Sequence, residues 1–190
     1  MERHPKKMLD VATGTADMAI MASGILKPDL ITGIDISEGM LEIGQKKIQK
    51  LGLQQQIKLL KGDSETINFE DNSFDAVTVA FGVRNFEKLE KGLMEIYRVL
   101  RPGGRLVVLE FSRPRNRITR FAYNVYMKIV APGMGKLFSK NRCAYQYLDK
   151  SIKMFPEGKN FIRILDTLGF RNSFYKPLSL GICSIYCGEK

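Results

Sequence analysis

Three short loops in the first third of the chain carry residues that could bind a nucleoside. Gly14 lies in a loop of small residues, and its missing side chain lets the backbone approach a ligand closely. Asp35 lies twenty residues after Thr15, which is the place and charge for holding two ribose hydroxyls. Asp63 and Ser64 offer a carboxylate and a hydroxyl that could read an adenine amino group. Together these loops predict a site for one nucleoside-like ligand.

The same loops do not favour a dinucleotide. The G-x-G-x-x-G fingerprint needs glycines at 14, 16 and 19, and the sequence has Gly14, Ala16 and Ala19. The carboxylate of Asp10, just before the loop, also disfavours a phosphate close by. A cationic ligand with an amino group fits better, and we expect S-adenosylmethionine. For the Gly14 loop taken alone, an ordinary strand-to-helix turn is the alternative.

These loops must be positioned by strands that end at one edge of a sheet. The predicted strands are 8–12, 30–34, 57–61, 74–81 and 105–111. The predicted helices are 17–24, 37–51 and 87–100, with Ser37 as an N-cap, Gly52 as a stop and a turn at 101–104. Strands that alternate with helices predict an α/β fold with a parallel sheet. Ligands bind at the carboxyl ends of such strands.

The last third of the chain follows a different pattern. The segment from Arg113 to Lys153 reads as irregular, aromatic and basic. After it, we predict a helix at 158–168 and an antiparallel hairpin of strands 170–176 and 182–188, joined at 177–181. We therefore expect a single domain over 1–190, with a basic and aromatic insertion at 113–157 that forms a lid over the substrate.

Length and composition exclude several classes of protein. With 190 residues, 44% of them hydrophobic, the chain can bury a core and is not disordered. Cys183 and Cys187 would lie about 13 Å apart along a strand, too far for a disulfide. The odd cysteine count indicates a reduced, intracellular protein. The one histidine, His4, leaves none for a catalytic triad or a Cys/His zinc site, and we expect no metal.

The charge balance points to an anionic partner. The net charge is +10, and the segment 113–153 holds ten basic residues and one acidic residue. Its basic side chains alternate with aromatic and aliphatic ones, which suits an anionic lipid surface. A solvated cap over the sheet and, less favoured, a nucleic-acid surface are the alternatives. No apolar run approaches the ~20 residues of a membrane span, so we expect a cytoplasmic protein that is peripheral to the inner face of the cell membrane.

Several motifs resemble one enzyme family. LDVATGTAD, GIDISEGML, GDSETINFEDNSFD and RVLRPGG are similar to the class I S-adenosylmethionine-dependent methyltransferases. FGVRNF (81–86), RVLRPGGRLVVLEFS (98–112) and segments 147–151, 155–156 and 180–182 resemble the ubiquinone/menaquinone biosynthesis C-methyltransferases. The resemblance covers nearly the whole chain. It implies a Rossmann-like, seven-stranded, mostly parallel sheet with an antiparallel C-terminal hairpin and an insertion after the fifth strand.

The resemblance assigns cofactor roles to residues at the predicted strand ends. Gly14 and Thr15 would line the methionine end, and Asp10 would reach its amino group through water. Ala80 would lie near the transferred methyl group. Asp35 would hold the ribose.

At the adenine end, the resemblance places Asp63 and Ser64 on the edge of the base. Met40 would pack on the adenine, with a helix-core methionine as the alternative. Ala16 stands where the family has a glycine, and its methyl group could crowd the cofactor.

The family's acceptor is a ring carbon of a polyprenyl hydroquinone, which becomes nucleophilic when a ring hydroxyl loses its proton. Arg84 and Asn85 follow the fourth strand, beside the expected methyl group. Arg84 would stabilise the ring oxygen or prime its deprotonation, and an ion pair with Glu87 is the alternative. The ring can be a naphthoquinol or a benzoquinol.

The group that takes the proton is left open, because no histidine is available. Tyr126, Tyr145 and Tyr147 are the candidate tyrosines, and a carboxylate or water could serve instead.

Two other functions fit part of the sequence. An RNA or other small-molecule methyltransferase is one, although FGVRN is not the Asn/Asp-Pro-Pro-aromatic motif of enzymes that methylate exocyclic amines. A non-catalytic nucleoside-binding module is the other. Family members carry some tens of residues before the first strand, including a motif with histidine and tryptophan. This sequence has seven residues before Met8 and no tryptophan, so we expect that an N-terminal segment is missing.

Overall fold

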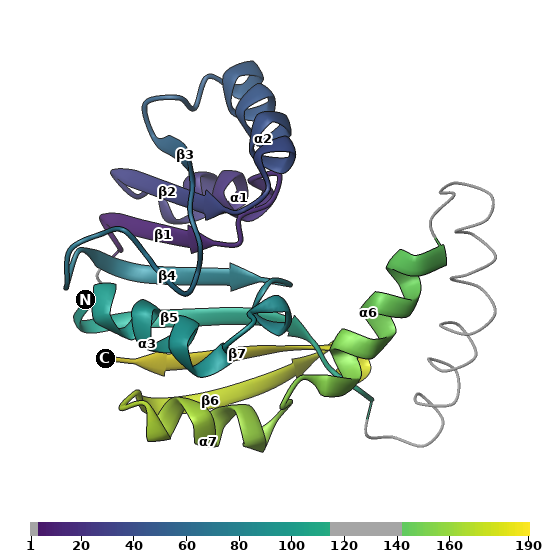
Figure 1. Ribbon diagram of the computed structural model, residues 1–190. Helices are drawn as coiled ribbons and strands as arrows, with labels where there is room; N and C mark the ends of the chain where they lie inside the picture. The colour runs from purple at the N-terminus through teal and green to yellow at the C-terminus, as the bar shows by residue number, and fades with distance from the viewer. Residues whose placement is uncertain (1–3, 115–141) are drawn as a thin grey trace.

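The computed structural model describes residues 4–114 and 142–190, which form one seven-stranded sheet with helices packed on it (Figure 1). The strands are β1 (Lys7–Val11), β2 (Leu30–Asp35), β3 (Ile57–Lys61), β4 (Phe74–Ala80), β5 (Leu100–Phe111), β6 (Arg171–Leu178) and β7 (Cys183–Glu189). The α-helices are α1 (Asp17–Leu26), α2 (Glu38–Leu51), α3 (Leu89–Val99), α6 (Arg142–Met154) and α7 (Lys159–Thr167). Two 3-10 turns, η1 (Val83–Asn85) and η3 (Ser179–Gly181), complete the described elements.

The strand order is β3-β2-β1-β4-β5-β7-β6. β1 to β5 pair in parallel, and β7 runs antiparallel between β5 and β6. The predicted α/β class, the parallel sheet and the C-terminal hairpin are therefore confirmed. The order reverses between β2 and β4, so the carboxyl end of β1 is the switch point at which ligands bind in open α/β sheets.

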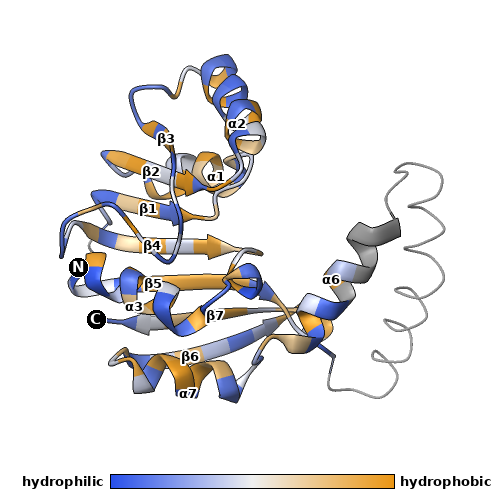
Figure 2. Ribbon diagram, viewed as in Figure 1, coloured by the Kyte–Doolittle hydropathy of each residue, from blue (hydrophilic) through white to orange (hydrophobic). Residues whose placement is uncertain are grey.

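Two clusters of buried side chains hold the helices on the sheet. In one, Ala19 of α1 and Ile48 of α2 pack with Met8 and Ile31 of the strands. In the other, side chains of α3 and α7 pack with β4, β5 and β7. Hydrophilic and hydrophobic residues alternate along α2, as expected of a helix with one buried face (Figure 2). The central strands are thus rigidly held, and so are the loops at their ends.

The helices differ from the prediction in three respects. α1 continues through Gly24, which is exposed, and stops where Lys27 adopts a left-handed φ of 49° before Pro28. Ser37 makes no side-chain cap, and its N–H donates to Asp35 instead. The segment 142–154 is helical, so the prediction of irregular structure there was wrong. Gly52 ends α2 in the left-handed conformation, as predicted.

The predicted turn at 101–104 is part of β5. The pairing with β4 shifts register between Phe74 and Ala76, which absorbs the extra residues as an irregularity inside the ladder. Gly103 N donates to Lys190 O at 2.7 Å, and Lys190 N donates to Gly104 O at 3.0 Å. These bonds to Lys190 hold the glycine-rich segment within β5, although Gly103 has a positive φ of 77°. Cys183 and Cys187 are free thiols, as expected.

The predicted lid falls largely on residues 115–141, which lie outside the described residues. The described parts of it are residues 113 and 114, where Arg113 pairs with Glu157, and the stretch from α6 onward, which leads into α7 beside β6 (Figure 1).

Candidate functional site

The loop after β1 winds tightly because three of its residues have left-handed backbone. Ala12, Gly14 and Ala16 have φ angles of 54°, 56° and 63°. A Cβ added at Gly14 would lie 3.2 Å from Cε of Met40. The backbone of Gly14 also has a positive φ, which residues with a side chain rarely adopt. The sequence prediction that this position needs glycine is consistent with both observations. Backbone is thus exposed to a ligand beside the switch point.

Asp35 joins this loop to the end of β2. Its Oδ2 accepts a hydrogen bond from Gly14 N at 2.8 Å, and its Oδ1 accepts one from Ser37 N at 2.9 Å. Each carboxylate oxygen can accept a second hydrogen bond. Asp35 is half-buried, so both oxygens are held in place while the group stays accessible to ribose hydroxyls.

Asp10 lies beneath the loop rather than on its surface. Its carboxylate is 1% exposed and accepts hydrogen bonds from Thr13 Oγ1 at 2.5 Å and Thr78 Oγ1 at 2.6 Å. Burial raises the pKa of Asp10 from 3.8 to about 6, the two hydroxyls lower it, and the charge of Asp35 adds to the increase. Within residues 4–114 and 142–190, the partners of this carboxylate are hydroxyls and no cation, and a buried carboxylate of this kind favours a cation nearby. That is the chemistry expected beneath the amino group of S-adenosylmethionine.

The side chains of Thr15 and Ala16 point away from the ligand side of the loop. Thr15 Oγ1 donates to Asp17 Oδ2 at 2.5 Å and accepts from Lys47 Nζ at 2.9 Å. Only the backbone of Thr15 is therefore available to line the methionine end. Ala16 is fully buried, and its Cβ lies 3.2 Å from where a Cβ on Gly44 of α2 would stand. The methyl group that could crowd a cofactor thus packs on α2.

The loop after β3 lies beside Asp35. Gly62 N donates to Asp35 O at 3.0 Å, and Asp63 Oδ1 accepts from Glu65 N at 2.9 Å. Asp63 is exposed and Ser64 is half-buried, as residues that read the edge of a base must be. Met40 is 43% exposed in the first turn of α2, so the helix-core alternative was wrong.

The loop after β4 packs against the loop after β1. A Cβ added at Gly82 would lie 2.5 Å from Cβ of Ala12, a distance that no side chain tolerates. Ala80 is the half-buried last residue of β4, and Phe81 turns into the left-handed region with a φ of 55°. This close approach carries η1, and with it Arg84 and Asn85, to the switch point.

Arg84 pairs with Glu110, the penultimate residue of β5. Arg84 Nη1 donates to Glu110 Oε1 at 2.7 Å, and Arg84 N donates to Glu110 Oε2 at 3.2 Å. Nη1 also donates to Phe81 O, and Cζ lies 5.3 Å from the centre of the Phe111 ring. The predicted alternative partner, Glu87, was therefore wrong.

Glu110 is a functional candidate that the sequence prediction missed. Its side chain is fully buried, and burial raises its pKa while Arg84 and two backbone N–H groups lower it. The signal was present, because Glu110 is an acidic residue inside the apolar run RLVVLEF. An acidic residue inside a buried strand is rare unless it is paired. The pair fixes the guanidinium, which is 11% exposed, at the carboxyl edge of the sheet.

Asn85 is tied to α6. Tyr147 Oη donates to Asn85 Oδ1 at 3.1 Å, and both residues are exposed. Of the three candidate tyrosines, Tyr147 is thus the one placed beside Asn85, and the side chain of Tyr145 lies outside what the structure describes. Tyr126 lies outside the described residues. Within residues 4–114 and 142–190, no cluster of histidine, cysteine or acidic side chains could hold a metal ion.

Relatives of known name match most of the chain. A family model described as the ubiE/COQ5 methyltransferase family matches residues 1–190. A demethylmenaquinone methyltransferase from Bacteroides fragilis is 46% identical over 98% of this chain and 76% of its own length. The ubiquinone/menaquinone biosynthesis C-methyltransferase UbiE from Geotalea daltonii is 43% identical over 97% of this chain and 78% of its own length.

Solved structures share the fold. A SAM-dependent methyltransferase from Aquifex aeolicus has a TM-score of 0.69 at 20% identity, over 96% of this chain and 81% of its own. A phosphoethanolamine N-methyltransferase from Haemonchus contortus, solved with S-adenosylhomocysteine, has a TM-score of 0.70 at 14% identity, over 97% of this chain and 49% of its own. With the family model, these findings give one conclusion: the chain belongs to the ubiE/COQ5 methyltransferase family and is an S-adenosylmethionine-dependent methyltransferase.

Proposed function

We propose that this chain methylates a ring carbon of a polyprenyl hydroquinone, converting a demethylmenaquinol to a menaquinol or performing the equivalent step on a benzoquinol. The observation that carries this proposal is the Arg84–Glu110 pair, which sets a cation at the carboxyl edge of the sheet, next to the loop that follows β1. The names of the Bacteroides fragilis and Geotalea daltonii relatives point to the same substrates.

The strand-end loops hold S-adenosylmethionine in this proposal. When bound, its sulfonium supplies the methyl group. Asp35 accepts hydrogen bonds from the ribose hydroxyls, and the backbone at Gly14 and Thr15 lines the methionine end. Asp10, buried beneath, attracts the ammonium group through water. Ala80 borders the position of the methyl group.

The adenine end of the site is formed by three side chains. Asp63 and Ser64 meet the edge of the base, and Met40 packs on its face. The support for Met40 is that 43% of its surface is exposed in the first turn of α2, which begins three residues after Asp35.

Arg84 acts on the acceptor. A phenolic ring becomes a carbon nucleophile when its hydroxyl loses a proton and the charge spreads into the ring. A fixed cation beside that oxygen lowers the barrier by a few kcal/mol, on the order of one oxyanion-hole donor. Glu110 and the Phe111 ring hold the guanidinium in one orientation, so no reorganisation is needed during the reaction.

In our proposal a tyrosine relays the proton of the ring hydroxyl: its oxygen accepts that proton while its own hydroxyl proton passes to water. After methyl transfer, the ring carbon loses its hydrogen as a proton and the ring oxygen regains one, which restores the aromatic hydroquinol. Tyr126 is retained as a candidate from the sequence. Tyr147 is favoured by its hydrogen bond to Asn85, which follows Arg84 directly.

Methyl transfer from isotopically labelled S-adenosylmethionine tests the function. Short-chain demethylmenaquinol and the matching benzoquinol are the acceptors, and the product is examined for a new carbon–methyl bond. Transfer to either ring supports the proposal and selects the acceptor. Methylation of RNA with a steep dependence on salt would identify the alternative enzyme. Cofactor binding without transfer to any acceptor would identify a nucleoside-binding module.

We also propose that the basic segment 113–153 docks the enzyme on an anionic membrane, as part of a lid formed by residues 113–157. Among the described residues no helix is long and apolar enough to cross a bilayer. The support is the ten basic residues against one acidic residue in that segment. Vesicle sedimentation tests it: binding should rise with anionic lipid, fall with salt and drop when Arg115, Arg117 and Arg120 are replaced by Gln. Equal binding to neutral and anionic vesicles would contradict it.

A further inference from the structure

The connection from β3 to β4 has no helix, although it crosses the sheet past β2 and β1. Residues 62–73 form turns and extended backbone, and one of them, Ile67, packs into the core with 3% of its surface exposed. A helix would satisfy its own N–H and C=O groups, but irregular backbone packed on a core needs other partners. Those partners come from α3.

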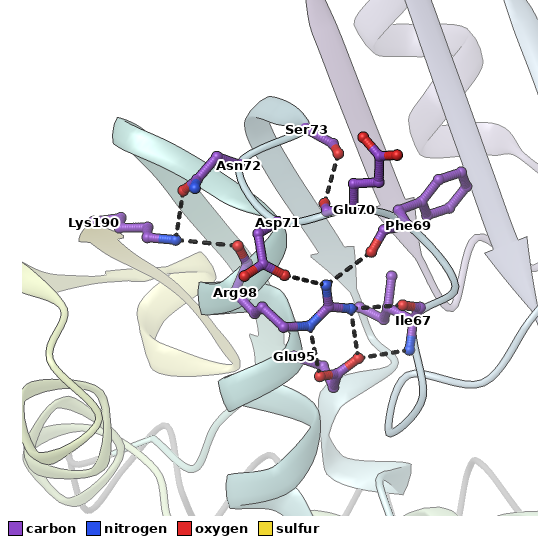
Figure 3. Close-up of polar contacts among 9 residues, drawn as sticks. All are labelled: Ile67, Phe69, Glu70, Asp71, Asn72, Ser73, Glu95, Arg98 and Lys190. Atoms are coloured by element: carbon purple, nitrogen blue, oxygen red, sulfur yellow. Dashed lines mark hydrogen bonds and ion pairs between the residues drawn. The ribbon is translucent and has the colours of Figure 1, made fainter.

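Arg98 and Glu95, one turn apart on α3, supply them (Figure 3). Arg98 Nη2 donates to Ile67 O at 2.7 Å, and Nη1 donates to Phe69 O at 2.8 Å. Glu95 Oε2 accepts from Ile67 N at 2.9 Å and also from Arg98 Nη2 at 2.9 Å. Both backbone groups of Ile67 are therefore held by one ion pair. Its partners keep the pKa of Glu95 below its usual range, so the pair stays charged.

This pair fixes one end of a turn that begins at Asp63. Thr66 N donates to Asp63 O at 3.3 Å, which closes the turn directly before Ile67. At the other end, Gly62 is held by its hydrogen bond to Asp35 O. The turn that carries Asp63 and Ser64 is thus only four residues long and is anchored on both sides.

We propose that Arg98 and Glu95 are positioning residues for the adenine end of the cofactor site, acting through the turn 63–66. The inference rests on the proposed role of Asp63. Neither side chain touches the cofactor in this arrangement. Asp71, the fourth partner of Arg98, is exposed and contacts the guanidinium at 2.7 Å without holding the turn.

Discrimination between two bases tests the inference. S-inosylhomocysteine carries a carbonyl where S-adenosylhomocysteine carries the amino group that Asp63 would accept from. Calorimetry should show that the unchanged chain prefers the adenine ligand and that Asp63→Asn loses the preference. Arg98→Lys and Glu95→Gln should each reduce the preference for the adenine ligand by about ten-fold, which is the contribution of one hydrogen bond to a charged group. Asp71→Asn is the matched control and should keep it.

Hydrogen exchange supplies a readout that is independent of binding. The amides of residues 63–67 should exchange faster in Arg98→Lys and Glu95→Gln, while those of β1 and β5 stay protected. Equal loss of affinity for both ligands, or an unchanged preference, would overturn the positioning role while leaving the methyltransferase intact. An unchanged chain that binds neither ligand would instead contradict the proposed function, and this inference with it.

Discussion

Gly14 and Asp35 are joined by a hydrogen bond of 2.8 Å from the Gly14 backbone N–H to Asp35 Oδ2. Asp35 is the last residue of β2, and Gly14 lies in the loop after β1, the neighbouring strand, in which Val11 pairs with Ile34. The bond sets the spacing between the loop proposed for the methionine end and the carboxylate proposed for the ribose. Asp35 therefore has a structural task in addition to any contact with a ligand.

Replacing Asp35 with Ala should affect binding and folding together. Affinity for S-adenosylmethionine should fall by about 2–3 kcal/mol, because two hydrogen bonds to a charged group are lost. The free energy of unfolding should fall by about 1–2 kcal/mol, because the N–H groups of Gly14 and Ser37 lose their acceptor. Calorimetry and urea unfolding measure the two effects. Glu38→Gln, on the exposed pair with Lys61, is the control and should change neither. Unchanged affinity would contradict the ribose assignment.

Asp10 should make stability decrease as pH rises. In the unfolded chain its carboxyl ionises near its ordinary value of 3.8, and in the folded protein its pKa is about 6. Below 3.8 it is protonated in both states and imposes no penalty. Between pH 3.8 and about 6 the carboxyl ionises in the unfolded chain but not yet in the folded one, so the free energy of unfolding falls as pH rises. The loss reaches its full size of about 3 kcal/mol once the pH is above the folded pKa.

Asp10→Asn should remove this dependence. The difference in unfolding free energy between Asp10→Asn and the unchanged chain should move by about 3 kcal/mol in favour of the variant between about pH 3 and about pH 7. Urea unfolding at several pH values measures it, and the difference cancels the titration of all other groups. A difference that does not vary with pH would mean that Asp10 ionises near its ordinary value.

The fold was predictable because its signals are local. Apolar runs that end at Asp35 or Gly62 mark strand ends, and Gly52 stops α2 where expected. The turn predicted at 101–104 failed for a non-local reason. Gly103 and Gly104 are part of β5 because Lys190, from the far end of the chain, bonds to both.

The sequence was enough to predict that the loops after β1 and β2 lie together, but it was not enough to predict the contacts around η1. Gly14 and Asp35 are neighbours because adjacent parallel strands end together, which follows from the strand pattern alone. The partner of Arg84 was not predictable, since Glu87 is near in sequence and Glu110 is near only after β4 and β5 pair. Arg98 was visible only as part of a family motif, because its contacts depend on the path of the β3–β4 connection.

Arg84→Lys should lower turnover by about ten-fold or more and leave cofactor affinity near normal, because the charge remains and the planar fork is lost. Steady-state kinetics and calorimetry separate the two. Equal losses in both would place Arg84 in the cofactor site or in folding.

Glu110→Gln should destabilise the protein by about 3–5 kcal/mol, because it leaves a nearly buried guanidinium unpaired. Changing both partners to apolar residues of similar volume, Arg84→Met with Glu110→Leu, should recover most of that stability. The double variant should still lack turnover. If it is as active as the unchanged chain, the pair serves only folding.

Tyr147 links α6 to the turn that carries Arg84, through the 3.1 Å hydrogen bond from its hydroxyl to Asn85 Oδ1. Tyr147→Phe deletes only this hydroxyl. We expect turnover to fall by about 100-fold or more, because the hydroxyl that takes the ring proton is removed, with cofactor affinity unchanged. Asn85→Ala combined with Tyr147→Phe should lose little more than either change alone, because the two residues act as one unit. A loss of only about ten-fold for Tyr147→Phe would limit this tyrosine to orienting Asn85. Full activity in Tyr147→Phe, with a large loss in Tyr126→Phe, would return that role to Tyr126.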